Sequence, residues 1–302
     1  MHLPTKHSPM AFAYGAFAYG IRLRSIRLPF AALDTKKFCA TNSRVHAAEH
    51  AMDAMSVLRA MSVLRARAAH NGETMLLTAA ILGCGEEMDM LLRNGADVNE
   101  ASTRPMTVGY TALHYAAANN RTRMIARLLK AGAKVYEANN SGETPLSFAA
   151  KYGYAVVVEQ LLKAGANPNH RDKNGDTPLH EASKRRFGLD VGKQQYAFVV
   201  KQLLNKGARV NDANKKGFTP LLNAVQNGCV YVVHLLLTAG ADPNQAALAV
   251  NPMWEGEDGA TPLHLAAEKG NTRMLARLLK AGANPNKEDE DEVRPLHTAA
   301  KH

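Results

Sequence analysis

The chain has 302 residues, of which 46% are hydrophobic and 21% are charged, and its formal net charge is +10. No stretch approaches the roughly 18 consecutive apolar residues that cross a bilayer, so we expect no transmembrane segment. Three widely spaced cysteines, Cys39, Cys84 and Cys229, argue against both a disulfide framework and a zinc site, and they favour a reducing compartment.

Most of the excess positive charge lies at the N-terminus. Residues 1–70 contain ten Lys or Arg and three acids, whereas the remainder of the chain carries 27 bases and 24 acids. We expect a disordered basic arm over residues 1–45 and a helical N-terminal cap over residues 46–70, because the terminal unit of a stacked array must cover an apolar face. The arm permits an alternative function, in which it binds nucleic acid or an anionic surface. It also leaves mitochondrial import open, since no acid precedes Asp34.

From residue 71 onward, one signature recurs seven times. The copies begin at Thr74, Thr111, Thr144, Thr177, Thr219, Thr261 and Arg294. Thr is a good helix N-cap and Pro fits the first helical position, so each copy predicts the start of a helix. Paired alanines and then paired leucines follow in most copies, and they predict two helices packed against each other. A Gly stands 21 residues after the Thr in five of the first six copies and predicts the end of the second helix.

This unit resembles the ankyrin repeat, which has about 33 residues and the pattern Thr-Pro-Leu-His-x-Ala. The pattern is clearest at Thr177-Pro178-Leu179-His180 and at Thr261-Pro262-Leu263-His264. The resemblance implies an all-α helix-turn-helix solenoid with protruding β-hairpin fingers, which spans residues 71–302 as about six full repeats and a partial seventh. Because the seventh copy stops inside its first helix, we expect a truncated or partial product.

Three units are longer than the regular 33 residues, and the first of them has its surplus in its finger, at Ala101-Ser102-Thr103-Arg104. Thr177 and Gly207 are 30 residues apart, which predicts about nine extra residues between paired helices, near Arg186 to Gln195. Another surplus falls in the finger between Asn244 and Gly259, which contains the only tryptophan, Trp254. Loop insertions destabilise a fold only slightly, so the extra residues can be tolerated drift in exposed loops. A binding role for them stays open as well.

The signature contains a histidine in four copies: His114, His180, His264 and His297. Each stands at the start of a helix, where we expect a ring nitrogen to bond the backbone instead of a metal ion. The chain has no Gly-rich phosphate loop, nucleophile elbow or His-Glu-x-x-His pair. We therefore predict that it is not an enzyme and uses no cofactor, metal or small-molecule substrate.

The resemblance implies that partner proteins bind at the fingertips and the exposed side of the first helices, on a concave face. The candidate partner-binding residues on this face are Tyr110, Lys151, Tyr152, Lys184, Arg185, Lys215, Lys216, Phe218, Trp254 and Asp258. The same mapping places Glu73 and Asp176 there. Aromatic residues among cations are typical of interface anchors, so we predict that the middle of the face binds an acidic segment of a partner.

These observations favour a non-catalytic adaptor or scaffold in the cytoplasm or nucleus, whose array binds protein and not nucleic acid. An alternative is a targeting module of a larger or multi-chain enzyme, for example a pathogen effector that acts on host proteins. Delivery into a host cell therefore stays open as well.

Overall fold

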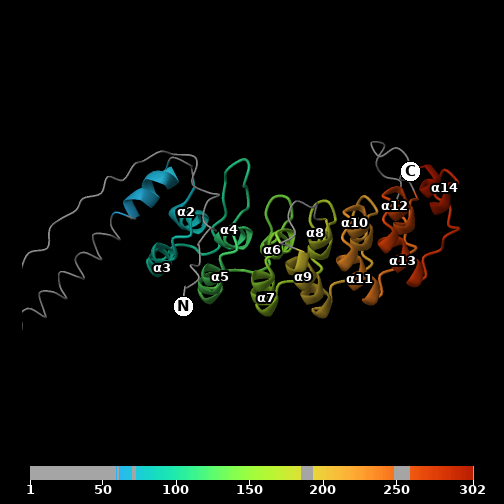
Figure 1. Cartoon of the computed structure of the whole chain (residues 1–302). Helices are drawn as coiled ribbons and strands as arrows, with labels where there is room; N and C mark the ends of the chain where they lie inside the picture. The colour runs from blue at the N-terminus through green and yellow to red at the C-terminus, as the bar shows by residue number, and fades with distance from the viewer. Residues whose placement is uncertain (1–58, 60, 70–72, 185–192, 248–258, 302) are drawn as a thin grey trace, which may run out of the picture. The chain divides into compact units, whose positions relative to one another are not determined.

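The computed structural model describes residues 59, 61–69, 73–184, 193–247 and 259–301 (Figure 1). The chain divides into two units, Met1–Asp53 and Ala54–His302, and all the described residues lie in the second unit. The predicted basic arm falls outside the described residues. Within the region predicted as a cap, residues 61–69 are helical, and Leu64 is buried in the same hydrophobic cluster as Leu76.

The described residues form a series of helix pairs. The first helices of the pairs are α2 (Met75–Leu82), α4 (Ala112–Ala118), α6 (Pro145–Lys151), α8 (Pro178–Ser183), α10 (Pro220–Gln226), α12 (Pro262–Glu268) and α14 (Pro295–Lys301). The second helices are α3 (Gly85–Arg93), α5 (Thr122–Lys130), α7 (Ala155–Lys163), α9 (Lys193–Asn205), α11 (Val230–Thr238) and α13 (Thr272–Lys280). First helices pack on first helices and second helices on second helices, in two rows (Figure 1). The predicted all-α solenoid is therefore confirmed.

The first helices begin where the threonines predict. The hydroxyl oxygen of Thr144 accepts a hydrogen bond from the N–H of Ser147 at 3.3 Å, and that of Thr219 accepts one from the N–H of Leu222 at 3.2 Å. Proline follows as the first helical residue in both cases, where its missing N–H leaves no bond unmade. The N-cap and the proline thus set the same helix start in unit after unit.

The core runs along the whole array. First helices contribute fully buried leucines such as Leu146 and Leu179, and second helices contribute Leu161 and Leu203. Burial of one such side chain contributes about 2 kcal/mol, and the surface that buries it comes partly from the next unit. Each unit therefore depends on its neighbours for stability, as expected of a stacked array.

The fingers are built from turns that the side chain of an Asn or Asp holds in place. The Oδ1 atom of Asn139 accepts the N–H groups of Ser141 and Glu143, each at 2.9 Å. The same turn recurs at Asp172, Asn214 and Asp289. Over the described parts of the fingers, β-pairing is limited to an isolated bridge between Ala101 and Thr111.

Neighbouring fingers are also bonded to each other. The N–H of Lys173 donates to the carbonyl of Ser141, and the N–H of Lys215 donates to the carbonyl of Asn174, both at 2.9 Å. The backbone of one fingertip is therefore held by the fingertip before it.

The long fourth unit uses part of its extra sequence as helix. Helix α9 has 13 residues, whereas α7 and α11 have nine each, so the surplus is only partly a loop. Residues 185–192 lie outside the described residues, and so does most of the long fifth finger, residues 248–258.

Candidate functional site

The signature histidines join each unit to the finger that follows it. The Nδ1 atom of His114 accepts the N–H of Thr111 at 3.1 Å, and its Nε2 lies 3.1 Å from the carbonyl oxygen of Glu143. Since Nδ1 accepts a hydrogen bond, Nε2 carries the proton and donates it to that carbonyl. The rings of His180 and His264 make the same link, at 3.0 and 2.9 Å. The predicted backbone role of these histidines is confirmed.

Burial determines the charge state of the His114 ring. It lowers the pKa of His114 to about 4, and the nearby Glu143 offsets only part of that shift. The imidazole is therefore neutral at physiological pH, as the two hydrogen bonds require.

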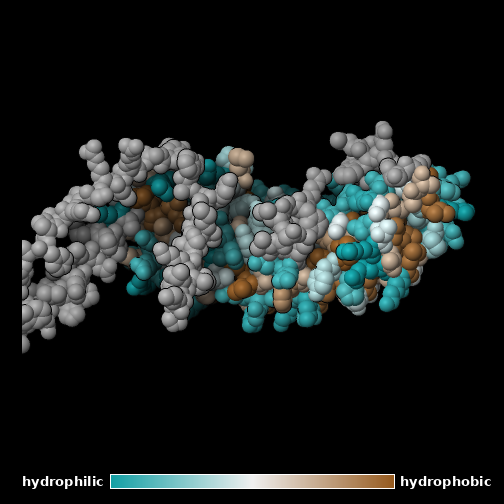
Figure 2. All heavy atoms as spheres, viewed as in Figure 1, coloured by the Kyte–Doolittle hydropathy of each residue, from teal (hydrophilic) through white to brown (hydrophobic). Residues whose placement is uncertain are grey.

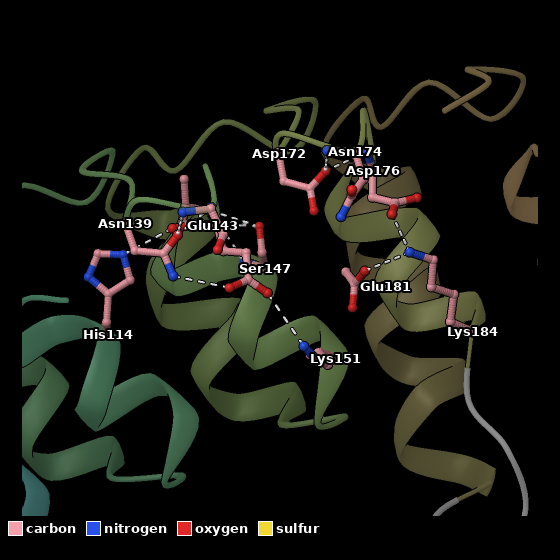
Figure 3. A network of polar contacts seen from close by, with 12 residues as sticks. His114, Asn139, Glu143, Ser147, Lys151, Asp172, Asn174, Asp176, Glu181 and Lys184 are labelled. Atoms are coloured by element: carbon pink, nitrogen blue, oxygen red, sulfur yellow. Dashed lines mark hydrogen bonds and ion pairs between the residues drawn. The ribbon is translucent and has the colours of Figure 1, made fainter. Parts of the chain in front are cut away.

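Two carboxylate–lysine sets lie next to each other on the fingers and first helices (Figure 3). In the first set, Glu143 lies 3.4 Å from the ammonium of Lys151 and accepts a hydrogen bond from the Nδ2 of Asn139 at 3.0 Å. Burial opposes the charge of Lys151, but the acids Glu143 and Glu181 outweigh it and raise the pKa of Lys151. Lys151 is therefore a paired cation.

The second set surrounds Lys184. Its ammonium donates to Asp176 and, at 3.0 Å, to Glu181. The Asp176 side chain is only 3% exposed, and it also accepts a hydrogen bond from the Nδ2 of Asn214 at 2.8 Å. Oxygens of Asp172, Asp176 and Glu181 lie within 4.8 Å of one another, and the cation that this cluster holds is the Lys184 ammonium. Burial disfavours that charge, but the two acids outweigh it and raise the pKa of Lys184.

A cleft of about 400 Å³ lies where these two sets meet. Its lining residues are Glu143, Lys151, Asp172, Asn174, Glu181 and Lys184. Three carboxylates and two ammonium groups face this space, so its charge is mixed. It suits hydrogen bonding to a polar segment better than binding of a strongly charged one.

Aromatic rings flank the first set. The ring of Tyr110 lies 5.2 Å from that of Phe148 and 5.6 Å from that of His114, between centroids. Tyr152 stacks on Tyr154 at 5.8 Å and is 44% exposed, whereas Tyr110 is half-buried. Tyr152 is therefore the aromatic side chain of this group that is most open to a partner.

The remaining predicted site residues differ in accessibility. Lys215 and Lys216 are exposed at a fingertip, while Phe218 is partly buried, packs on the core, and accepts a hydrogen bond from His180 through its carbonyl oxygen. Arg185, Trp254 and Asp258 lie outside the described residues.

The expectation that Glu73 and Asp176 face solvent is wrong, because both are buried. The side chain of Glu73 is 1% exposed and accepts hydrogen bonds from Ser102 at 2.8 Å and from Tyr115 at 3.1 Å. The position just before the helix-start Thr lies beneath the following finger. Glu73 and Asp176 are therefore covered by the finger that follows them, whereas Glu143, at the same position of its unit, is only partly buried.

A second set of hydrogen bonds between neighbouring units was not predicted from the sequence. The Oδ1 of Asn169 accepts the N–H of Arg209 at 2.8 Å, and its Nδ2 donates to the carbonyl of Gly207 at 2.9 Å. Asn211 and Asn244 link their units to the next in the same way. The available signal was an Asn that recurs four residues after the helix-ending Gly.

Comparison with known proteins agrees with this architecture. A family model described as ankyrin repeats, three copies, matches residues 42–139, 79–172, 132–194 and 157–247, and a model described as ankyrin repeat matches residues 258–290. No curated protein matches the chain. None of the described helices is long and apolar enough to cross a membrane. Ankyrin repeats are generally protein–protein interaction modules and are typically non-catalytic. The chain belongs to the ankyrin-repeat family.

Proposed function

We propose that this protein is a non-catalytic adaptor that binds an acidic segment of a partner protein with its fingertips and first helices. The observation that carries the proposal is the exposure of Lys215 and Lys216 on a fixed fingertip. The N–H of Lys216 bonds the Oδ1 of Asn214 at 2.9 Å, and the N–H of Lys215 bonds the preceding finger. A fixed backbone lowers the entropy lost when these side chains bind a partner.

Neighbouring groups extend this surface. Lys173 is exposed on the preceding fingertip, whose backbone bonds the finger before it. Tyr152 offers an exposed aromatic ring on the first helices, and aromatic rings often anchor protein interfaces. The adjacent fingers thus present ammonium groups, and Tyr152, at the end of α6, adds an aromatic contact.

Lys151 and Lys184 have a different role in this proposal. Each is already paired with carboxylates of its own chain, so a partner carboxylate would have to displace Glu143 or Asp176. We assign these two lysines to the shape and hydrogen bonding of the mixed-charge cleft, and we assign the attraction of an acidic partner to the fingertip lysines. Tyr110 and Phe218 are partly buried, so we assign them a packing role in this surface. Arg185, Trp254 and Asp258 remain candidates because of the sequence alone.

A charge-reversal experiment tests the proposal. The intact chain and the variant Lys215→Glu/Lys216→Glu are each cross-linked to partners in cell extract, and the captured proteins are identified by mass spectrometry. The matched control is Lys130→Glu/Lys280→Glu, which makes the same charge change at the last turns of α5 and α13. We expect partners whose Asp- or Glu-rich segments cross-link to the fingertips to be lost with the fingertip variant and retained by the control. Equal recovery by all three proteins would contradict the proposal.

The basic N-terminus supports a second candidate function. With ten Lys or Arg against three acids, residues 1–70 have the composition of a segment that binds nucleic acid or another polyanion. If this is the main function, deletion of residues 1–58 abolishes binding to a polyanion such as heparin, and binding by the intact chain falls steeply with salt.

A further inference from the structure

One position of the second helix carries an exposed apolar side chain in three successive units. Val156, Phe198 and Tyr231 are 57%, 60% and 58% exposed. Each stands five residues before the first leucine of the pair that fills the core. Since α7 packs on α9 and α9 on α11, equivalent positions on these helices form a row across them, which we call the outer stripe. Single exposed apolar residues are common, whereas a continuous apolar surface usually marks an interaction site.

A groove runs beside the outer stripe. It has a volume of about 610 Å³ and lies between α9 and α11, where it is lined by Gln194, Ala197, Phe198, Lys201, Tyr231 and Leu235. Most of these side chains are apolar or aromatic, and Lys201 adds a cation. In Figure 2, hydrophobic patches lie among hydrophilic ones over the row of second helices. The groove is therefore an apolar site with a cation in its lining.

The helices around the stripe are strongly basic. Together α5, α7, α9, α11 and α13 contain nine Lys or Arg and a single acid, Glu159, which is paired with Lys163 at 2.6 Å. At the stripe position itself, Arg123 and Arg273 take the place of the apolar residue in α5 and α13. The near balance of charge in the array thus hides an uneven distribution, with cations concentrated on the second helices from α5 to α13. Helix α3 differs, since it carries three acids and one Arg, and its Asp89 pairs with Arg127 of α5.

The positive charge of these helices indicates which kind of molecule can bind in the groove. The N-terminal segment of the same chain is basic, so it would be repelled by the surface. The helices around the outer stripe of a second copy are basic too, so a second copy would also be repelled. An acidic partner meets no such repulsion, and charge complementarity both speeds its association and selects it over other proteins.

We propose that the outer stripe is a second docking surface, which binds an acidic amphipathic helix of a partner protein in the groove between α9 and α11. Apolar side chains at helical spacing enter the groove against Phe198, Tyr231 and Leu235, as in other complexes of a helix with a groove. Carboxylates on the flanks of the bound helix pair with Lys201 and Arg273. This surface lies on the second helices and is separate from the fingertip lysines, so the adaptor can hold two partners at once.

A peptide-display selection tests this second surface. A library of 18-residue peptides is selected in parallel against the intact chain and against Phe198→Ser/Tyr231→Ser, whose altered side chains are both largely exposed. Tyr136→Ser is the control, because it removes an exposed aromatic ring that belongs to neither proposed surface. Peptides enriched on the intact chain but not on Phe198→Ser/Tyr231→Ser are synthesised and titrated against all three proteins and against Lys201→Glu. Circular dichroism checks that every variant is folded.

We expect enriched peptides that are rich in Asp and Glu and have apolar residues at helical spacing. Their Kd should rise about tenfold or more with Phe198→Ser/Tyr231→Ser, because the two rings become buried anchors in the complex. It should also rise with Lys201→Glu and should not change with Tyr136→Ser. Three results overturn the proposal. One is a lack of enrichment over the double variant. Another is binding to phosphatidylserine vesicles that the same substitutions abolish, which assigns a membrane surface. The third is a dimer of this chain that the substitutions dissociate, which assigns a second copy.

Discussion

The Nε2 atom of His114 lies 3.1 Å from the carbonyl oxygen of Glu143, a residue 29 positions further along the chain. The other ring nitrogen accepts the N–H of Thr111, so one imidazole closes the start of a helix and bonds the next finger. A protonated ring would turn a second N–H toward the N–H of Thr111. The link therefore requires the neutral ring.

We predict that the array becomes less stable as the pH falls from about 6.5 toward 4. The pKa of His114 is lowered to about 4 by burial, and the pKa of His180 is lowered for the same reason, while an unfolded histidine titrates near 6.5. Well above pH 6.5 the imidazole rings are neutral in both the folded and the unfolded chain, so they cause no loss of stability. Below it the unfolded chain binds more protons, which for His114 removes on the order of 3 kcal/mol.

Urea unfolding between pH 7.5 and 4 measures this loss. Buried and paired carboxylates also respond to acid, so the informative comparison is with His114→Gln, which has no ionisable ring. Its free energy of unfolding should fall less steeply over the same interval. A slope identical to that of the unmodified chain would show that His114 does not titrate as predicted.

Exchanging the side chains of Asp176 and Asn214 should restore the amide–carboxylate hydrogen bond, which Asp176→Asn alone weakens and Asn214→Asp alone removes. Their hydrogen bond is 2.8 Å long and buried, and it joins two units. Asn214→Asp places two carboxylates together, and Asp176→Asn removes one of the two carboxylate charges that pair with Lys184. We expect each change to cost about 2 kcal/mol. In the double variant an amide donor again faces a carboxylate acceptor, with their positions exchanged. Thermal unfolding of the three variants should therefore show the double variant as more stable than the sum of the single changes.

Replacing the fingertip residue Gly142 with Ala should destabilise the array more than the same change at Gly132. Both glycines have positive φ angles, +79° and +89°, which alone cost a residue with a Cβ about 1 kcal/mol. A Cβ at Gly142 would also lie 2.9 Å from the backbone nitrogen of Lys173, whereas a Cβ at Gly132 meets nothing within 4 Å. We expect an additional loss of about 1 kcal/mol or more at Gly142, measured by urea unfolding. Equal losses would mean that neighbouring fingers separate easily.

Tyr136→Asn should stabilise the array. Tyr136 is 63% exposed and stands four residues after Gly132, where other units have the Asn that bonds the next unit. An Asn at this place can accept the N–H of Asn167 and donate to the carbonyl of Gly165, as Asn169 does with Arg209 and Gly207. These bonds should add about 1 kcal/mol to the free energy of unfolding. Tyr136→Ala is the control, since it removes the ring without adding the bonds, and it should give no gain.

The sequence predicted well those features that act within one unit. Thr144 and Thr219 begin helices where their N-cap chemistry requires, and His114 and His180 bond the backbone as their position suggests. The prediction was poorer where the next unit contributes. Asp176 stands at an apparently exposed helix start but is buried, because the finger that carries Asn214 covers it.

The sequence by itself determined the order of the described helices and where most of them begin and end, because N-caps, paired leucines and helix-ending glycines are local signals. The length of α9 was not predicted. Only the tertiary structure decided which charges are free to meet a partner. Lys184 and Lys215 are both cations of the predicted face, yet one is bound by carboxylates and the other is exposed at a fingertip. The outer stripe likewise exists only because α7, α9 and α11 pack side by side. Residues from separate units become neighbours through stacking, and the spacing within one unit does not reveal which of them will meet.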